Sequence, residues 1–214
     1  MRIVCLLLSL VAVANGMERV WIRMAGQWPV EGAPLIADQN GDGRKEALLV
    51  NRGGQLMAWS LDGVALGAGQ DGTQVMLPEG RWSSTPTLLG GGRLMLASVE
   101  GTVVVLDRDF HIMWQRKLAG ETAWTMGRPA IPRPGLYCFG DRKGVVTCFS
   151  DNGDVEWKAD LGEPIRLAPL VHGTAMMVAA GRSLLALDAA GKTLWKQDAG
   201  GLIVTGPVAQ GHGV

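Results

Sequence analysis

The chain has 214 residues, of which 47% are hydrophobic, 6% are aromatic and 31 are glycine. This glycine content favours one all-β domain with many turns, and no segment has the hydrophobic period of a helix. The 20 Lys and Arg residues balance the 20 Asp and Glu residues, so no net charge would attract nucleic acid or an anionic membrane.

The stretch from Met1 to Gly16 has the pattern of a secretory signal peptide. Arg2 supplies a positive end, residues 3–11 form an apolar core too short to span a bilayer, and residues 12–14 fit a cleavage site. We therefore expect a signal peptide over 1–14 and an exported chain over 15–214, either periplasmic or secreted. The alternative is a buried first strand. No later stretch is long and apolar enough to predict a membrane-spanning helix.

Prolines mark a sequence repeat that recurs at similar steps along the chain. Each of them opens a short apolar run, and after the first four a second apolar strand, a glycine turn and a hairpin follow. Repetition of short strands and glycine turns at such regular steps predicts a β-propeller array. The five prolines are Pro34, Pro86, Pro129, Pro169 and Pro207, and second strands are expected at 47–50, 94–99, 136–139 and 175–179.

The hairpin recurs with a tryptophan at its end. Residues 184–195 read LLALDAAGKTLW, earlier copies end at Trp157 and Trp114, and the first copy has Gly67 in the tryptophan place. These copies resemble the quinoprotein-like (PQQ-like) propeller repeat, with its Ala-Leu-Asp…Gly-Lys…Leu-Trp core. The resemblance implies four-stranded antiparallel blades, with the rings of Trp114, Trp157 and Trp195 between neighbouring blades.

Both ends of the array look incomplete in the sequence. Trp21 lies in the place of an outer strand without earlier strands of its own blade, and the chain stops soon after Pro207. We expect about four blades and two part-blades. The simplest account is the N-terminal fragment of a larger propeller. The alternatives are a small closed ring or an assembly of chains.

The stretch DQNGDGRKE, residues 38–46, is a candidate calcium loop. Oxygen ligands at relative positions 1, 3 and 5 converge when glycine at position 6 turns the loop sharply. Predicted strands flank it, and Leu49 stands where an EF-hand has glutamate, so it resembles an FG-GAP or VCBS calcium loop. The alternative is a polar turn without metal. The expected ligands of a structural Ca²⁺ are Asp38, Asn40, Asp42, the Arg44 carbonyl and Glu46.

The linkers before three of the prolines carry arginine and tryptophan. In a propeller such linkers gather at one mouth of the central channel, where these side chains could hold an anionic or sugar-like ligand. The simpler interpretation is tryptophan packing between blades, with arginine extending along the surface. The candidate ligand-binding residues are Arg81, Trp82, Trp124, Arg128 and Arg166.

Two cysteines flank a predicted hairpin turn at 141–144. If Asp141 pairs with Val145, the register places Cys138 opposite Cys148 at a non-hydrogen-bonded pair, which is close enough for a bridge. An exported protein meets oxidising conditions, so we predict a disulfide. The alternative is two buried free thiols.

The leading functional hypothesis is a non-enzymatic exported β-propeller that serves as a binding or scaffold module for a protein or extracellular ligand. It resembles PQQ-like scaffolds, including the propeller lipoprotein of the outer-membrane barrel-assembly machinery, although no lipid-attachment cysteine is found. The alternatives are a fragment of a quinoprotein dehydrogenase or of a polysaccharide-active propeller. Adjacent cysteines typical of the former are missing, so PQQ is not expected, and no catalytic residue is assigned.

Overall fold

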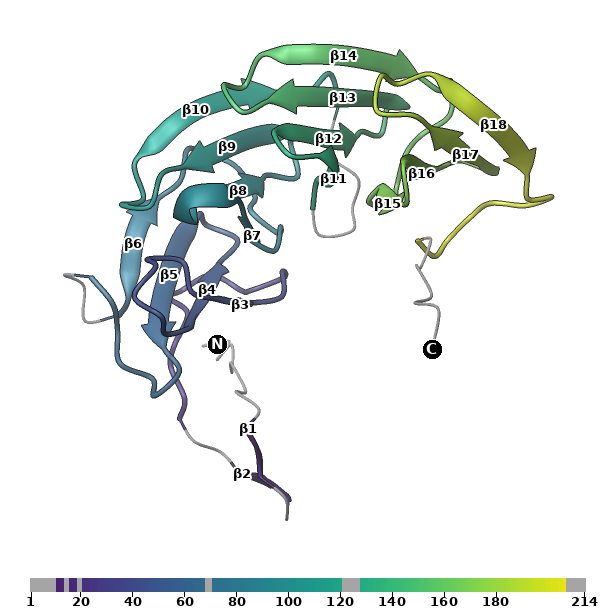
Figure 1. The fold of residues 1–214 in the computed structure, drawn as a ribbon. Helices are drawn as coiled ribbons and strands as arrows, with labels where there is room; N and C mark the ends of the chain where they lie inside the picture. Colours follow the sequence, from purple (N-terminus) through teal and green to yellow (C-terminus); the bar gives the residue numbers. More distant parts are fainter. Residues whose placement is uncertain (1–10, 14–15, 19–20, 68–70, 121–127, 207–214) are drawn as a thin grey trace. The chain divides into compact units, whose positions relative to one another are not determined.

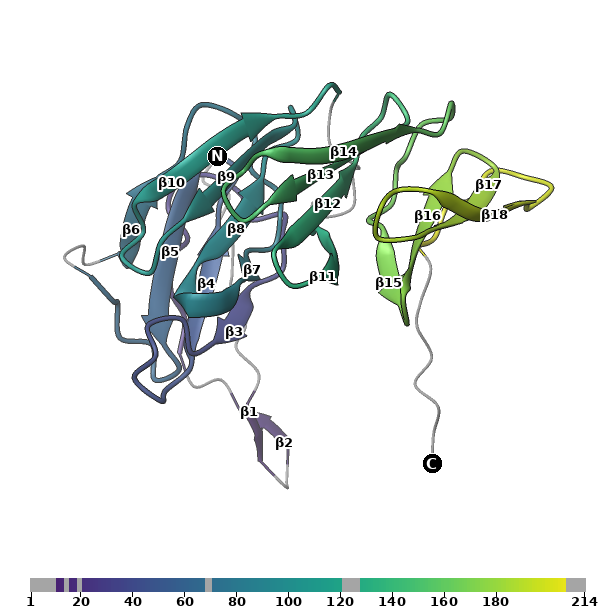
Figure 2. The ribbon, with the colours of Figure 1, turned by 45° about the horizontal axis from the view of Figure 1, so that its top comes forward.

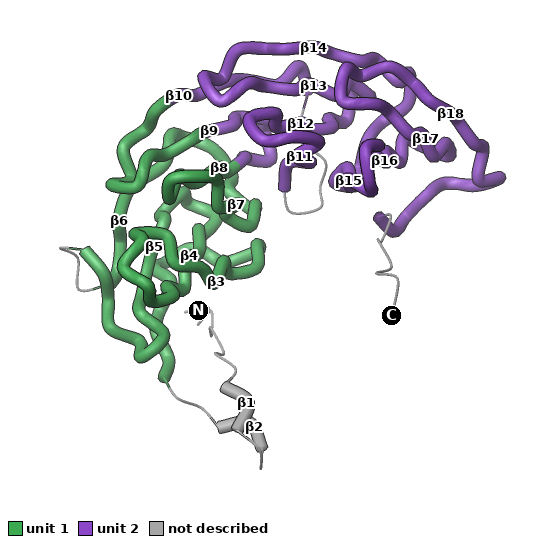
Figure 3. The backbone as a smooth tube through the Cα atoms, in the orientation of Figure 1, with its two compact units in different colours: residues 1–96, 105–113 green, residues 97–104, 114–214 purple. Residues whose placement is uncertain are grey.

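A computed structural model describes residues 11–13, 16–18, 21–67, 71–120 and 128–206. Strands dominate, and the one helical turn among these residues is the 3₁₀ turn η1 (Gly90–Gly92). Two compact units divide the chain: unit 1 holds residues 1–96 and 105–113, and unit 2 holds 97–104 and 114–214 (Figure 3). The all-β class is confirmed.

The described residues contain four four-stranded antiparallel sheets, each with its strands in chain order (Figures 1 and 2). This confirms the predicted blades. Their bounds are β3 (Leu35–Ala37), β4 (Glu46–Val50), β5 (Gln55–Ser60) and β6 (Thr73–Met76); β7 (Thr87–Leu88), β8 (Leu94–Ala97), β9 (Thr102–Leu106) and β10 (Ile112–Lys117); β11 (Ala130–Arg133), β12 (Leu136–Gly140), β13 (Val145–Ser150) and β14 (Val155–Asp160); β15 (Leu170–His172), β16 (Ala175–Ala180), β17 (Ser183–Leu187) and β18 (Thr193–Asp198).

The middle strands of the sheets are mostly buried, and the fourth strands are more exposed. Every residue of β4, β8, β9 and β12 is buried, whereas every residue of β18 is exposed. A strand covered on both faces needs apolar side chains in both directions. This explains the continuous apolar runs LMLA in β8 and TVVVL in β9.

The core of unit 2 runs through the sheets β11–β14 and β15–β18. Buried side chains from β12, β13, β16 and β17 form one cluster, and Trp157 and Leu161 pack against it. The cluster includes Cys138 and Cys148, which face each other in the predicted register and form a disulfide with a Cα–Cα distance of 4.0 Å. The disulfide therefore links two neighbouring strands of one sheet.

The turn between the cysteine strands explains this register. Asp141 Oδ1 accepts the backbone N–H of Lys143 and of Val145, and Gly144 has a φ of 90°. Glycine reaches this left-handed conformation without a Cβ clash. The turn length then fixes which residues of β12 and β13 face one another.

The N-terminal residues form a small separate pair of strands. β1 (Val11–Val13) pairs antiparallel with β2 (Gly16–Glu18). The predicted cleavage point between residues 14 and 15 lies outside the described residues. In the part of the chain that the structure describes, no helix has both the length and the apolar character needed to cross a membrane.

Candidate functional site

The hairpins between the third and fourth strands share one turn design. In each, a Ser or Asp side-chain oxygen accepts the backbone N–H four residues later, over 2.8 to 3.2 Å. Such bonds hold the turn closed from within. The four oxygen-bearing residues are Ser60, Asp107, Ser150 and Asp188.

Three of the described tryptophans dock on these turns. The indole Nε1 of Trp21 donates to the Leu61 carbonyl, that of Trp114 to Asp151 and that of Trp157 to Ala189, at 2.6, 2.9 and 2.9 Å. Each acceptor lies two residues before a glycine with a φ near 80°, namely Gly63, Gly153 or Gly191.

The ring of each docked tryptophan lies against its glycine. A Cβ added to Gly63, Gly153 or Gly191 would lie 2.6 Å from an indole ring atom, closer than real Cβ contacts allow. The turn therefore needs glycine for two reasons, the backbone conformation and the ring. The docking of Trp114 and Trp157 agrees with the sequence prediction.

Trp195 departs from that prediction, because 45% of its surface is exposed. It occupies the same third position in β18 that Trp114 and Trp157 occupy in β10 and β14. Its sheet is the last one among the described residues. No turn of a following sheet is therefore described against its ring.

At the hairpin of the second sheet, both the tryptophan and the glycine of this docking are missing. Ala65 pairs with Trp59 as Val155 pairs with Phe149, which places Gly67 where the ring should be. On the turn, Phe110 takes the glycine place with a φ of 65°, and it is the only non-glycine residue with positive φ among those described.

Gln39 supplies part of the missing contact. Its Nε2 donates to the Arg108 carbonyl at 2.9 Å and to the Gly92 carbonyl at 2.8 Å. Arg108 lies two residues before Phe110, so its carbonyl is the counterpart of the acceptors for the indoles. The side chain of Gln39 is 3% exposed, and its backbone N–H donates to Glu46 Oε2 at 2.8 Å. A buried amide thus replaces the indole N–H, but it brings no ring.

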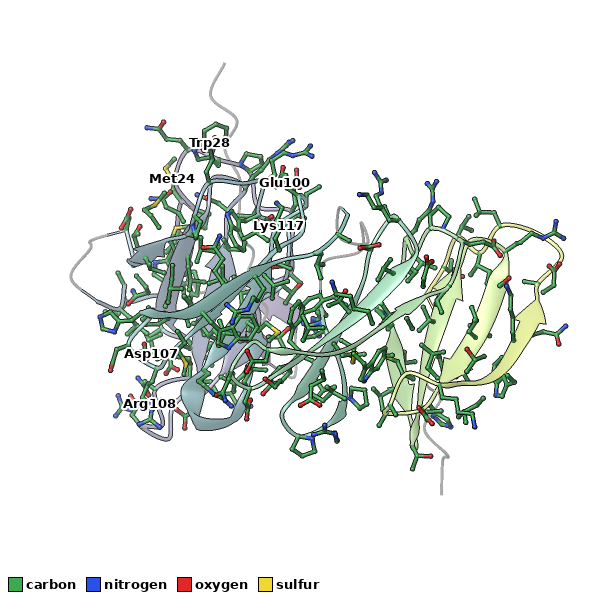
Figure 4. The ribbon with its side chains drawn as sticks, turned by 90° about the horizontal axis from the view of Figure 1, so that it is seen from above. Met24, Trp28, Glu100, Asp107, Arg108 and Lys117 are labelled. Atoms are coloured by element: carbon green, nitrogen blue, oxygen red, sulfur yellow. A yellow bond between two sulfur atoms is a disulfide. The ribbon has the colours of Figure 1, made fainter. Side chains whose placement is uncertain are left out.

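A pocket of about 510 Å³ lies beside this altered turn, entirely within unit 1. The guanidinium of Arg108 makes no hydrogen bond or ion pair within the described part of the chain, and the Phe110 ring is half-buried. Figure 4 shows Asp107 and Arg108 at the opposite end of the unit from Met24 and Trp28. The described residues that line the pocket are Gln39, Asn40, Leu66, Gly67, Gln74, Arg108, Asp109 and Phe110.

The candidate calcium loop is held by hydrogen bonds from its own backbone. The carboxylate of Asp38 accepts the backbone N–H of Gly41, Asp42 and Gly43, and one oxygen each of Asp38, Asp42 and Glu46 lie within 4.8 Å of one another. These hard oxygens suit Ca²⁺. The same Glu46 also holds Gln39, so the loop is tied to the altered turn. Calcium binding stays a prediction.

A second acidic group, Asp107 with Asp109 and His111, has a structural explanation. Asp107 Oδ1 accepts the backbone N–H of His111 and of Asp109, and Asp188 makes the same two bonds in its own turn. The hydrogen bond from the His111 backbone is the main cause that lowers the pKa of Asp107. Anchoring the turn therefore accounts for this carboxylate.

The structure distributes the other predicted ligand-binding residues over both units. Trp82 has no exposed surface and donates its Nε1 hydrogen to the Pro78 carbonyl, so its ring is part of the core and the ligand hypothesis is wrong for it. Arg81 is exposed in unit 1, and Arg128 and Arg166 are exposed in unit 2. Trp124 lies outside the described residues.

The pocket does not emerge from the sequence pattern alone, although a signal for it is present. The sequence shows Gly67 in the tryptophan place, and aligning Trp114 with Trp195 places Phe110 on Gly191, but the positive φ of Phe110 is seen only in the structure. Together, Gly67 in the tryptophan place and Phe110 in the glycine place mark a turn on which no tryptophan of the preceding sheet docks. In the sequence, Gln39 stands only as a residue between two expected ligands of the candidate calcium loop, Asp38 and Asn40.

Consecutive four-stranded antiparallel sheets, with tryptophans docked on the turn of the following sheet, define a β-propeller of the PQQ-like class. A family model described as outer membrane protein assembly factor BamB matches residues 99–210, just over half of the sequence. The chain therefore belongs to this family of PQQ-like propeller proteins. A search of curated proteins found no match.

Solved structures share the fold at low sequence identity. BamB from Moraxella catarrhalis is 18% identical, with a TM-score of 0.64 over 89% of this chain. Sqt1 from Saccharomyces cerevisiae is 11% identical, with a TM-score of 0.70 over 92%. The computationally designed Ika8 protein is 14% identical, with a TM-score of 0.58 over 75%. The chain spans 64%, 57% and 48% of these three proteins, respectively.

Proposed function

We propose that this chain is a non-enzymatic, exported β-propeller that binds a protein partner as a scaffold module. The observation that carries the proposal is the family match over residues 99–210. The matched description names an assembly factor, and a factor of that kind acts by binding other proteins. The repeated sheets support this use, since stacked repeats present an extended surface without needing a catalytic centre.

Export rests on two supports of different kinds. Residues 1–14 have the charge, apolar core and small residues of a signal peptide. The description of the matching family names an assembly factor for outer membrane proteins. We infer that the chain acts in the periplasm or beyond, where the Cys138–Cys148 bridge would persist.

We also propose that the loop 38–46 binds one structural Ca²⁺. Asp38, Asn40, Asp42 and Glu46 would supply side-chain oxygens, and Arg44 its carbonyl. A bound cation would offset the repulsion between three carboxylates. It would also fix Glu46, which orients Gln39 toward the Arg108 turn.

In-cell cross-linking would test protein binding. The full chain, with its own N-terminus and a C-terminal affinity tag, would be expressed in a Gram-negative host, treated with a lysine-reactive cross-linker and purified under denaturing conditions. We expect discrete adducts with one or a few exported proteins, absent when the designed Ika8 propeller is exported and treated alike. Recovery of the folded, exported chain without any such adduct would contradict the scaffold proposal.

The enzyme alternative has its own readout in the same preparation. The purified chain would be supplied with PQQ, Ca²⁺ and a set of alcohols and aldoses, and the reduction of a redox dye would be followed. We expect no reduction above the protein-free background. Dye reduction that depends on both the chain and PQQ would favour the quinoprotein dehydrogenase instead.

A further inference from the structure

We propose that the pocket at the altered turn receives an aromatic side chain, preferably tryptophan, from a protein partner. This inference rests on the proposed scaffold function, and it specifies where and by what chemistry the partner is recognised. The pocket lies between the interrupted outer strand of the first sheet, near Gly67, and the turn at 107–110. All of its described lining belongs to unit 1.

The chain contains its own template for the filled state. In unit 2, a hollow of about 400 Å³ remains beside the docked ring, lined by Trp157, Ala189 and Ala190, with the ion pair of Arg133 and Glu156 at its edge. There Trp157 projects from the fourth strand and docks on the turn of the next sheet. In unit 1, Gly67 replaces that tryptophan, and Arg108 and Asp109 replace the two alanines. The fold therefore builds a seat for a ring that its own sequence does not provide.

The pairing of the outer strand is interrupted beside this seat. The strand pairs at Ala65 with Trp59 and again from Thr73, where β6 begins, and residues 68–70 between them lie outside the described residues. Gln74 turns its amide toward Gly67, and a Cβ at Gly67 would lie 2.7 Å from Gln74 Oε1. The Gln74 Nε2 group donates to the carbonyls of Leu66 and Gly72. Its Oε1 thus remains as an acceptor, at the point where a docked ring would start.

The lining suits a neutral planar group. Leu66 and the half-buried ring of Phe110 supply apolar surface, and the exposed guanidinium of Arg108 can lie over a ring face. The chain shows this pairing elsewhere, because Arg116 Cζ lies 5.9 Å from the centroid of the Trp114 ring. Asp109 balances the charge of Arg108, so the pocket favours neither an anion nor a cation. An indole adds an N–H group that can donate a hydrogen bond to Gln74 Oε1.

Replacing Phe110 by glycine tests the role of its ring in the pocket. Its φ of 65° is the conformation of the glycines in the other turns, so Phe110→Gly suits the backbone while removing the aromatic wall. Arg108→Ala removes the cation and keeps the carbonyl that Gln39 uses. Arg133→Ala is the matched control, because it removes an exposed arginine beside the hollow that the docked ring of Trp157 lines.

Ligand-observed NMR on the full chain would test the pocket directly. The probes are N-acetyl-tryptophanamide and, for comparison, N-acetyl-leucinamide, measured by saturation transfer from the protein. We expect transfer to the indole protons that weakens about fivefold in Phe110→Gly and in Arg108→Ala, and that Arg133→Ala leaves unchanged. Equal transfer in all four proteins, or equal transfer to the leucine probe, would overturn the proposal. Circular dichroism would establish that each variant is folded.

The cross-linking experiment separates this proposal from the scaffold function. If wild-type chain forms partner adducts and Phe110→Gly forms them in equal yield, the pocket proposal fails and the scaffold function stands. If no adduct forms at all, the scaffold function fails. Self-adducts that disappear in Trp195→Ala would identify the exposed ring of a second copy as the occupant, and this would also overturn recognition of a different protein.

Discussion

Each docked tryptophan depends on two features of the turn that it meets. A backbone carbonyl accepts the indole N–H, and a glycine two residues later leaves room for the ring. Both features are local to one short turn. The contribution of a tryptophan to stability therefore depends on whether such a turn faces it.

Replacing Trp114 and Trp195 by alanine should have very different effects. Trp114 is 7% exposed and is docked on the Gly153 turn, so Trp114→Ala should lower the free energy of unfolding by about 3–5 kcal/mol. Trp195 is 45% exposed and no turn is described against its ring, so Trp195→Ala should cost less than about 1 kcal/mol. Urea unfolding followed by circular dichroism would measure both. Equal losses would mean that Trp195 is covered in solution.

The charge of Asp107 should make stability depend on pH. The hydrogen bond from the His111 backbone, followed by that from Asp109, lowers its pKa from the ordinary value of 3.8. A lowered pKa in the folded state contributes stability above the unfolded value, and this is lost as the pH falls through the folded value. Because solvent screens the exposed carboxylate, the contribution is at most about 1 kcal/mol.

Thermal unfolding across pH would check this expectation. Asp107→Asn should melt below wild type at neutral pH, and the difference should shrink below about pH 4. Asp62→Asn, at an exposed position of the corresponding turn in the first sheet, is the control. A difference that stays constant down to low pH would show that the substitution acts through shape and not through charge.

At the scale of single residues, the sequence predicts the ordinary docking better than the exception. Trp114 and Trp157 can be placed because each ends a recognisable copy of one motif. The ligand hypothesis fails for Trp82, since a tryptophan beside arginine in a linker looks the same in sequence whether it lines a channel or fills a core. The contact of Gln39 with Arg108 spans 69 residues, and no periodic pattern encodes it.

At the scale of one element, the loop 38–46 should respond to Ca²⁺. An ion that binds only the folded loop raises stability by about 2.7 kcal/mol at a free concentration a hundredfold above its dissociation constant. We expect a higher unfolding midpoint with excess Ca²⁺ than with chelator, and no such difference in Asp42→Ala. Identical midpoints for wild type under both conditions would leave a polar turn without metal as the explanation.

The disulfide hairpin offers a second prediction for an element. Cys138 and Cys148 close a loop with a sequence separation of 10 residues. A crosslink over such a loop lowers the conformational entropy of the unfolded chain and thereby stabilises the folded state by about 2–3 kcal/mol. A reductant should therefore lower the free energy of unfolding by about that amount. A variant with both cysteines changed to alanine should not respond to reductant. Two thiols that alkylate readily in unfolded, unreduced protein would show that the bridge does not form in solution.

At the scale of the whole molecule, export should remove the N-terminus. If residues 1–14 are a signal peptide, mass spectrometry of chain recovered outside the cytoplasm should find a mature protein that begins near Asn15. Replacing Arg2 and the apolar core residues should retain the full-length chain inside the cell. Exported protein that still carries Met1 would contradict the prediction.

The arrangement of sheets is the most predictable property of the molecule. The prolines and the Trp-ending hairpins recur at similar steps along the sequence, and each step corresponds to one four-stranded sheet. Repetition makes such patterns redundant, so an imperfect copy does not hide the fold. The pocket cannot be predicted in the same way, because it arises where two copies both depart from the pattern.

The amide of Gln39 also changes how one junction responds to the solvent around it. A docked indole is held largely by burial of apolar surface, which salting-out anions strengthen. The Gln39 contact consists of hydrogen bonds to two carbonyls, and these gain little from salting out. In concentrated sulfate, the contacts of the docked tryptophans should therefore become more stable, whereas the contact of Gln39 should not. The ionic composition of the surroundings, and not the sequence alone, would then decide which part of the chain loosens first.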